Sequence, residues 1–155
     1  NQGLELEYAQ RVNDFAHIRA SLGLLDSRYS GYNSPAGEDL NGRDQAHAPS
    51  YQYSASATFG GVSDWFGDIS IQGQDGFYFS DTHDFQSDAH ALINLGLGRY
   101  IGDFEAHFWI KNLFDQEYSV RGFFFGNDPR TGYADTGWTQ MGNPRQFGLS
   151  IRRDF

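Results

Sequence analysis

The sequence predicts an all-β fold, an antiparallel up-and-down meander of about seven strands without helices. Apolar and polar residues alternate with a period of two along most of the chain, which is the periodicity of strands. Short turn segments alternate with long polar loops, as expected for a series of hairpins. Aromatic residues make up 17% of the 155 positions, and 19 positions are glycine. Aromatic residues, which favour strands, and glycines, which favour turns, are therefore both frequent.

The first two runs predict a hairpin. Apolar residues at 4, 6 and 8 alternate with charged ones, and the pattern returns from residue 16 to residue 24. A three-residue turn at 13–15 would pair Leu6 with Leu22 and Leu4 with Leu24. Both apolar sets then lie on one face, as a consistent register requires.

The middle of the chain predicts two further strands between long loops. Residues 30–50 carry Gly, Asn, Pro, Ser and Asp without periodicity, which indicates a loop. Alternation returns over 51–59 and again from Ile69, beyond a turn at 61–67. The second of these runs is expected to end at 77–79 in Phe-Tyr-Phe, before an acidic loop at 80–88.

Residues 91–97 and 104–110 predict another hairpin with a tight turn at 101–102. A two-residue turn would pair Leu97 with Ala106 and leave one wholly apolar face. On that register His107 faces Gly96, which gives room to a bulky ring.

A glycine-rich and polar region from about residue 126 to residue 143 predicts a third long loop. The last strand follows at 147–155. The whole pattern leaves two unpaired strand edges, so we expect an open, curved sheet or edge pairing with another copy. If the structure were instead a closed barrel with a dry interior packed by Leu22, Ile93, Phe108 and Ile151, the apolar residues would face inward and not outward.

Charge excludes some functions. The formal net charge is −9 and the pI is about 4.7, which argues against a nucleic acid partner. Without cysteine, the chain has no disulfides and no thiolate metal site. No run approaches the ~18 apolar residues of a membrane helix. The first residues lack the features of a signal peptide, so we expect a mature chain, a cytosolic one or a piece of a longer protein.

Two all-β interpretations share the alternation. In a soluble aromatic-rich β-barrel or sandwich, for instance a carbohydrate-binding module, the apolar residues would point inward; in a transmembrane barrel they would face lipid. Alternating short turns and long loops favour the lipid bilayer, as does a second face of Glu, Arg, His, Asn and Gln. Aromatic residues also gather near strand ends, at Tyr29, Tyr51, Phe77, Phe79, Tyr100, Phe104 and Phe155.

Two long motifs carry a family resemblance. Residues 108–118, Phe-Trp-Ile-Lys-Asn-Leu-Phe-Asp-Gln-Glu-Tyr, resemble the W-[VI]-x-N-L-F-D-x-x-Y segment of the penultimate barrel strand of TonB-dependent outer-membrane receptors. Residues 142–155 resemble the last strand of that family, G-x-P-R-x-[FY]-G-[LV]-S-[LI]-R-x-x-F. Segments 22–29, 48–51 and 92–98 also fit, so the resemblance spans nearly the whole chain. It is silent on substrate.

The resemblance implies that residues 1–155 are the carboxy-terminal portion of a transmembrane β-barrel, without the amino-terminal plug domain. Such a receptor lies in the outer membrane of a Gram-negative bacterium. It takes up a scarce, bulky ligand such as a ferric siderophore, haem, cobalamin or oligosaccharide, with energy from TonB acting through the plug. Leu149, Ile151 and Phe155 resemble the signal that the barrel-assembly machinery recognises. Arg153 departs from the family, which usually has an aromatic residue there.

Six residues are candidate ligand contacts in the external loops, because rings and guanidinium groups suit flat chelates or sugars. They are Tyr29, Tyr32, Arg121, Phe124, Tyr133 and Trp138. A structural role, in which these side chains order the loops, accounts for the same residues equally well. Asn112 and Asp115 are expected to order the strand-to-loop transition through side-chain bonds to backbone.

Metal and catalytic sites are not expected. The segment 81–84, Asp-Thr-His-Asp, with Asp88 and His90 nearby, has metal-binding residue types but no ligand spacing. A solvated external loop is the favoured interpretation. No G-x-S-x-G motif accompanies the Ser, His and Asp residues. We therefore expect no enzyme, no metal and no cofactor.

Overall fold

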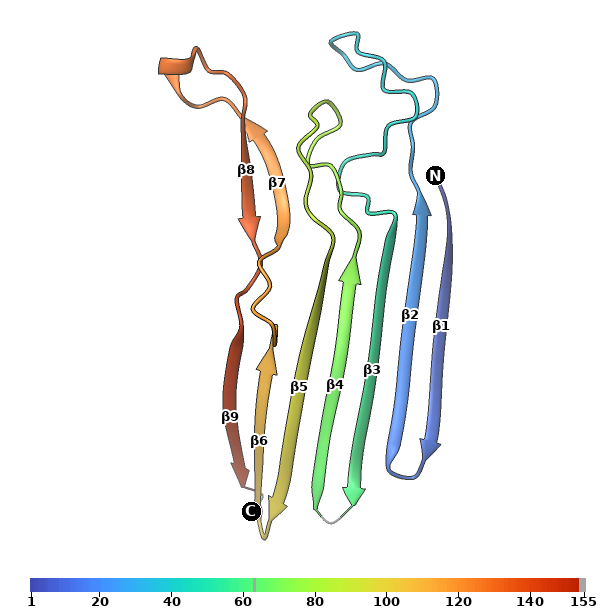
Figure 1. Ribbon diagram of the computed structural model, residues 1–155, viewed down its shortest axis with the longest axis vertical. Coiled ribbons are helices and arrows are strands. Elements are labelled where there is room, and N and C mark those ends of the chain that lie inside the picture. The colour runs from blue at the N-terminus through green and yellow to red at the C-terminus, as the bar shows by residue number, and fades with distance from the viewer. Residues whose placement is uncertain (63, 154–155) are drawn as a thin grey trace.

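The computed structural model describes residues 1–62 and 64–153 and consists almost entirely of β-structure (Figure 1). Within these residues, seven strands form one antiparallel sheet in the order β1-β2-β3-β4-β5-β6-β9. The open meander is confirmed, with β1 and β9 at its edges. The strands are β1 (Gln2–Asn13), β2 (Ala16–Asp26), β3 (Tyr51–Val62), β4 (Trp65–Gln74), β5 (His90–Ile101), β6 (Phe104–Lys111) and β9 (Gln146–Arg153).

A second, two-stranded sheet is formed by β7 (Ser119–Phe125) and β8 (Thr136–Met141). The prediction of a loop throughout 126–143 is therefore wrong for β8. Glycines at 137 and 142 interrupt the alternation there, so the sequence shows no strand pattern. Backbone pairing with β7 nevertheless forms the strand, with Phe123 opposite Trp138. A single 3-10 turn, η1 (Pro129–Thr131), lies at the tip of this hairpin.

No helix in the described part of the chain is long and apolar enough to cross a membrane.

The register of β1 and β2 is confirmed, with Leu6 opposite Leu22 and Leu4 opposite Leu24. The register predicted for β5 and β6 is wrong by two residues, because Leu97 lies opposite Phe108. Gly102 explains the difference: its φ of 59° fits the first central position of a tight hairpin turn.

That shift also moves His107, which lies opposite Gly98 and not Gly96. The His107 ring still leans over Gly96, since its Nε2 is 2.7 Å from the place that a Cβ on Gly96 would take. The expected room for a bulky ring is therefore present, although the paired glycine is a different one.

The two faces of the sheet differ in chemistry. Directly opposed residues in an antiparallel sheet project to the same side. One row crossing all seven strands of the main sheet reads Gln10, Ile18, Ala57, Ile69, Leu95, Ile110 and Phe147. A row on the opposite side reads Ala9, Arg19, Ser56, Ser70 and Asn94. We call these sides the apolar face and the polar face.

Three of the four buried hydrophobic residues in the described part of the chain, Leu40, Phe77 and Phe79, lie in loops outside the main sheet. Strand β4 ends at Gln74, so the prediction that it continues through 77–79 is wrong. Phe77 and Phe79 instead turn into the loops and are 7% and 4% exposed. The Phe77 backbone N–H donates a hydrogen bond to the Ser87 hydroxyl. This N–H is therefore not used for pairing with β3 or β5.

Candidate functional site: the loop cluster

Three segments pack together at one end of the sheet, opposite the short turns (Figure 1). They are the loop 27–50 between β2 and β3, the loop 75–89 between β4 and β5, and the β7–β8 hairpin with its tip. We call this assembly the loop cluster. Such positions are where binding residues are usually found, since loops carried on a rigid sheet can vary without disturbing it.

A small apolar core holds the loop cluster together. The Phe77 and Phe79 rings meet edge to face with their centroids 5.5 Å apart, and the His47 ring from the first loop lies 5.3 Å from the Phe77 ring. Leu40, also of the first loop, is 5% exposed. The Phe79 ring also lies flat against Gly122 of β7, where its nearest atom is 2.3 Å from the place that a Cβ would take. Only glycine at 122 allows this close approach, which joins the hairpin to the second loop.

Arg43 joins the first loop to the second. Its Nη1 donates to Asp84 Oδ1 at 2.7 Å, and its Nη2 donates to the backbone oxygen of His83. The guanidinium also lies 4.0 Å from the centre of the Tyr78 ring. Only 17% of the Arg43 side chain is exposed, whereas 94% of the Asp84 side chain is. The ion pair itself is therefore open to water and worth little, and the guanidinium is held mainly by the Tyr78 ring and the His83 backbone oxygen.

His83 joins the second loop to the hairpin. Its ring stacks on Phe124 of β7, with centroids 3.7 Å apart and an interplanar angle of 10°. On one side Nδ1 lies 2.9 Å from the Ser80 hydroxyl, and on the other Nε2 lies 3.7 Å from Asp135 Oδ2. A single imidazole therefore contacts its own loop, β7 and the segment that leads into β8.

Tyr29 and Tyr32 form a stacked pair on the first loop, with ring centroids 5.1 Å apart. Asp81 of the second loop accepts hydrogen bonds from the Tyr29 hydroxyl and from the Ala46 backbone N–H. Burial, followed by the contact with the Asp81 carboxylate, raises the pKa of Tyr29 above its ordinary value. The phenol is therefore held protonated and serves as a hydrogen-bond donor.

The six candidate ligand contacts do not form one pocket. Tyr29 and Tyr32 lie together, whereas one face of the Phe124 ring is covered by the stacked His83 ring. The remaining three, Arg121, Tyr133 and Trp138, are exposed along the hairpin. The exposed rings can stack on a planar ligand at separate places around the rim.

Trp138 borders a hollow of about 640 Å³ at the hairpin tip, together with Asp128 and Arg130. Arg130 Nη2 lies 2.8 Å from Asp128 Oδ2. This hydrogen-bonded contact lowers the pKa of the Asp128 carboxyl and keeps it ionised. The hollow is thus flanked by an ion pair and an indole ring.

Sequence reasoning missed the residues that organise the cluster, namely Leu40, Arg43 and the roles of the segment 81–84. The sequence distinguishes that segment only by its metal-binding residue types. In the structure its side chains serve different partners: Asp81 binds Ala46, His83 stacks on Phe124, and Asp84 pairs with Arg43. Within residues 1–62 and 64–153, no group of three His, Asp or Glu side chains could hold a metal ion.

Asn112 has the structural role that was predicted for it. It is 4% exposed, and its φ is 50°. Its Oδ1 accepts from the Gln116 N–H, while its Nδ2 donates to the backbone oxygens of Gln116 and Asn143. Asp115 Oδ1 likewise accepts from the Arg145 N–H at 2.7 Å. These bonds fix the point where β6 gives way to β7.

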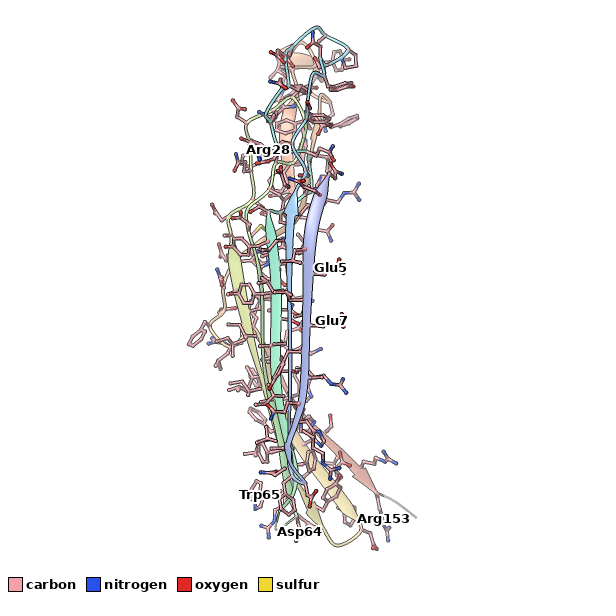
Figure 2. The ribbon with its side chains drawn as sticks, turned by 90° about the vertical axis from the view of Figure 1, so that its right-hand side faces the viewer. Glu5, Glu7, Arg28, Asp64, Trp65 and Arg153 are labelled. Atoms are coloured by element: carbon pink, nitrogen blue, oxygen red, sulfur yellow. The ribbon has the colours of Figure 1, made fainter. Side chains whose placement is uncertain are left out.

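The polar face carries a shallow groove of about 440 Å³ beneath the loop cluster. Figure 2 shows Glu5 and Glu7 projecting from one side of β1. The groove is lined by these carboxylates together with Ser21, Gln52, Ser54, Gln72, Gln74 and His90. Its chemistry suits water or a polar protein segment.

Two of the three residues predicted as an assembly signal lie on the edge strand β9. Leu149 and Ile151 project from the apolar face and are 64% and 67% exposed. Phe155 lies outside the described residues.

No family model matches the chain, but its structure is similar to that of solved receptors. The ferric yersiniabactin uptake receptor FyuA from Yersinia pestis superposes with a TM-score of 0.78 over 99% of this chain, at 18% identity. The siderophore receptor PiuA from Acinetobacter baumannii gives 0.73 over 96%, at 15% identity. The chain spans 23% and 20% of the length of these receptors. The chain therefore has the fold of the barrel portion of TonB-dependent receptors.

Proposed function

We propose that this chain forms the carboxy-terminal part of the barrel of a TonB-dependent outer-membrane receptor that takes up a scarce, bulky ligand. The observation that carries the proposal is the apolar face. Asp26 at the loop end and Arg99 and Arg153 at the turn end are the charged residues among its paired positions. A face this free of charge is suited to hydrocarbon.

The height of the apolar face supports the same conclusion. On β3, Tyr51 and Tyr53 mark its loop end and Phe59 its turn end. Tyr51 and Phe59 are eight residues apart, or roughly 26 Å at ~3.3 Å per residue. The nine positions from Tyr51 to Phe59 match the ~9–11 residues with which a tilted strand crosses the apolar layer of a membrane.

Exposure separates this proposal from the soluble alternative. A soluble barrel or sandwich would bury the apolar residues, yet Leu4, Ile69 and Leu97 are about half exposed. Among the described strands, β1 and β9 each have one unpaired edge. In a complete barrel both edges would pair with further strands, which removes unsatisfied backbone groups from the membrane.

The remaining parts of the proposal follow from this orientation. The polar face lines the lumen, where a plug connected to TonB would sit, and the loop cluster faces the outside of a Gram-negative cell. The ligand classes are ferric siderophores, haem, cobalamin and oligosaccharides, with siderophores favoured by the two similar receptors. The barrel-assembly machinery would insert the protein. We propose no enzymatic role.

Epitope tags test the orientation. One tag is inserted beside Gly37 in the first loop and another beside Gly102 in the β5–β6 turn, in the protein produced in a Gram-negative host. The proposal predicts that antibody labels intact cells only for the loop tag, and both tags after permeabilisation. Labelling of the turn tag on intact cells, or recovery of the untagged protein in the soluble fraction without detergent, would contradict it.

The ligand class is tested by growth under iron limitation. Deletion of the gene should abolish growth on one ferric hydroxamate, ferric catecholate or haem, and a plasmid copy should restore it. Growth unchanged on all three iron sources would remove iron uptake from the proposal and leave cobalamin and oligosaccharides to be tried.

A further inference from the structure

Two arginines project from the apolar face, both at its turn end. Arg99 follows Leu95 and Leu97 on the same parity of β5, and Arg153 follows Leu149 and Ile151 on β9. Figure 2 places Asp64, Trp65 and Arg153 at this end of the sheet, far from Arg28 at the other. Cations on a lipid-facing surface are tolerated only near its border with water.

Each arginine lies over an aromatic ring of the neighbouring strand. Arg99 is opposite Trp65 in the β4–β5 register, and its guanidinium carbon is 5.3 Å from the Trp65 ring centre. Arg153 is opposite Phe104, and the corresponding distance is 5.4 Å. The same arrangement therefore occurs twice on one belt of the barrel wall.

The Arg99 pair is open to a ligand. Arg99 is exposed, Trp65 is 41% exposed, and among the described residues no carboxylate forms an ion pair with Arg99. The ring fixes one side of the guanidinium and leaves its N–H groups available. A fixed guanidinium is the preferred partner of a phosphate, which it can bind through two parallel hydrogen bonds.

We propose that Arg99 and Trp65 form a binding site for the phosphate of an anionic phospholipid in the inner leaflet of the outer membrane. This inference rests on the proposed function, which places the face in lipid. A lipid headgroup is favoured over free phosphate because exposed apolar side chains surround the pair. Leu97, Ile101 and Phe104 lie beside it on the apolar face, where the acyl chains of the same lipid would cover them.

Fluorescence quenching by brominated lipids tests the site. The purified full-length protein is reconstituted in phosphatidylcholine vesicles containing either brominated phosphatidylglycerol or brominated phosphatidylcholine. The Trp65 signal is taken as the difference between the parent protein and its Trp65→Phe variant. We expect half-quenching at about fivefold less brominated phosphatidylglycerol than phosphatidylcholine, as one interfacial cation implies.

Arg99→Gln should abolish this preference. Arg19→Gln is the matched control, because Arg19 is an exposed arginine on the polar face, and this variant should keep the preference. Equal quenching by both lipids in the parent protein would overturn the site while leaving the membrane location intact. If neither lipid quenches Trp65, the apolar face is not in lipid or a second copy covers it. The phospholipid site would then be wrong together with the proposed membrane location.

Adding inorganic phosphate to the vesicles separates the two sources of anion. The lipid preference should persist with phosphate in excess over the lipid at constant ionic strength. If phosphate abolishes the preference, the site binds free phosphate and the assignment to a phospholipid is wrong.

Discussion

The imidazole of His83 lies face to face with the phenyl ring of Phe124, with their centroids 3.7 Å apart. The two residues belong to separate parts of the loop cluster, the loop 75–89 and strand β7. Because β7 and β8 pair only with each other among the described strands, the hairpin depends on such side-chain contacts to hold its place above the main sheet. The stack is therefore a point at which the cluster can be loosened without disturbing the wall.

Phe124→Ala should release the hairpin from the second loop. The loss is about 0.5–1.5 kcal/mol for the ring pair, in addition to the buried area. Hydrogen exchange should become faster over residues 119–125 and 136–141 and remain unchanged in β2 to β5. Phe123→Ala is the control, since Phe123 projects from the other side of the hairpin and is half exposed. Equal exchange in the two variants would show that the stack does not hold the hairpin.

Asn112→Ala should destabilise the wall by about 1–3 kcal/mol, because it leaves backbone groups of Gln116 and Asn143 without their partner. Asn112→Gly should cost less than Asn112→Ala, since glycine adopts the positive φ without strain. Urea unfolding in detergent micelles measures both. Asn143→Ala is the control, because Asn143 contributes a backbone oxygen to this network. Parent-like stability of Asn112→Ala would refute the role of Asn112.

Asp81→Asn should lower the pKa of Tyr29 towards its ordinary value, because it removes the negative charge beside the phenol. Part of the rise should remain, since burial is its largest cause. The amide oxygen of the new side chain can still accept from the Ala46 N–H, so the loop should keep its shape. The phenolate absorbance, corrected with Tyr29→Phe, reports the titration. An unchanged Tyr29 pKa would contradict the contact with Asp81.

The raised pKa of Tyr29 also predicts how the stability of the folded protein changes with pH. The pKa of Tyr29 is higher in the folded protein than in the unfolded chain, so its contribution is complete below about pH 10, the ordinary tyrosine value. It is lost as the pH rises through the folded value. The Tyr29→Phe variant should therefore lose less stability than the parent protein between neutral and strongly alkaline pH.

The main sheet could be predicted because its signal is local and repeated. The alternation over residues 4–24 and a short turn fix which residues oppose one another, and the observed pairing of Leu6 with Leu22 follows. In the β5–β6 hairpin the faces were predicted correctly but the register was wrong by two residues. Parity is set by the apolar pattern, whereas register also depends on the conformation of Gly102.

The loop cluster could not be predicted in the same way. Its contacts join residues far apart in the sequence, such as Arg43 with Asp84 and Phe79 with Gly122. No periodicity marks such pairs, because each depends on where the sheet brings its loops. Tyr29, Tyr32 and Phe124 were identified as loop aromatics, but their actual partners became visible only once the loops were assembled.

A pair of arginine substitutions at neighbouring positions tests the orientation of the wall most directly. Ile71 projects from the apolar face in the row of Ala55, midway between Tyr51 and Phe59, and Gln72 projects from the polar face at the same depth. The free energy of unfolding is measured for Ile71→Arg and Gln72→Arg in phospholipid vesicles. If the apolar face contacts lipid, Ile71→Arg should cost about 2–4 kcal/mol and Gln72→Arg close to nothing. Equal costs, or a larger cost for Gln72→Arg, would contradict the membrane orientation and the receptor function that depends on it.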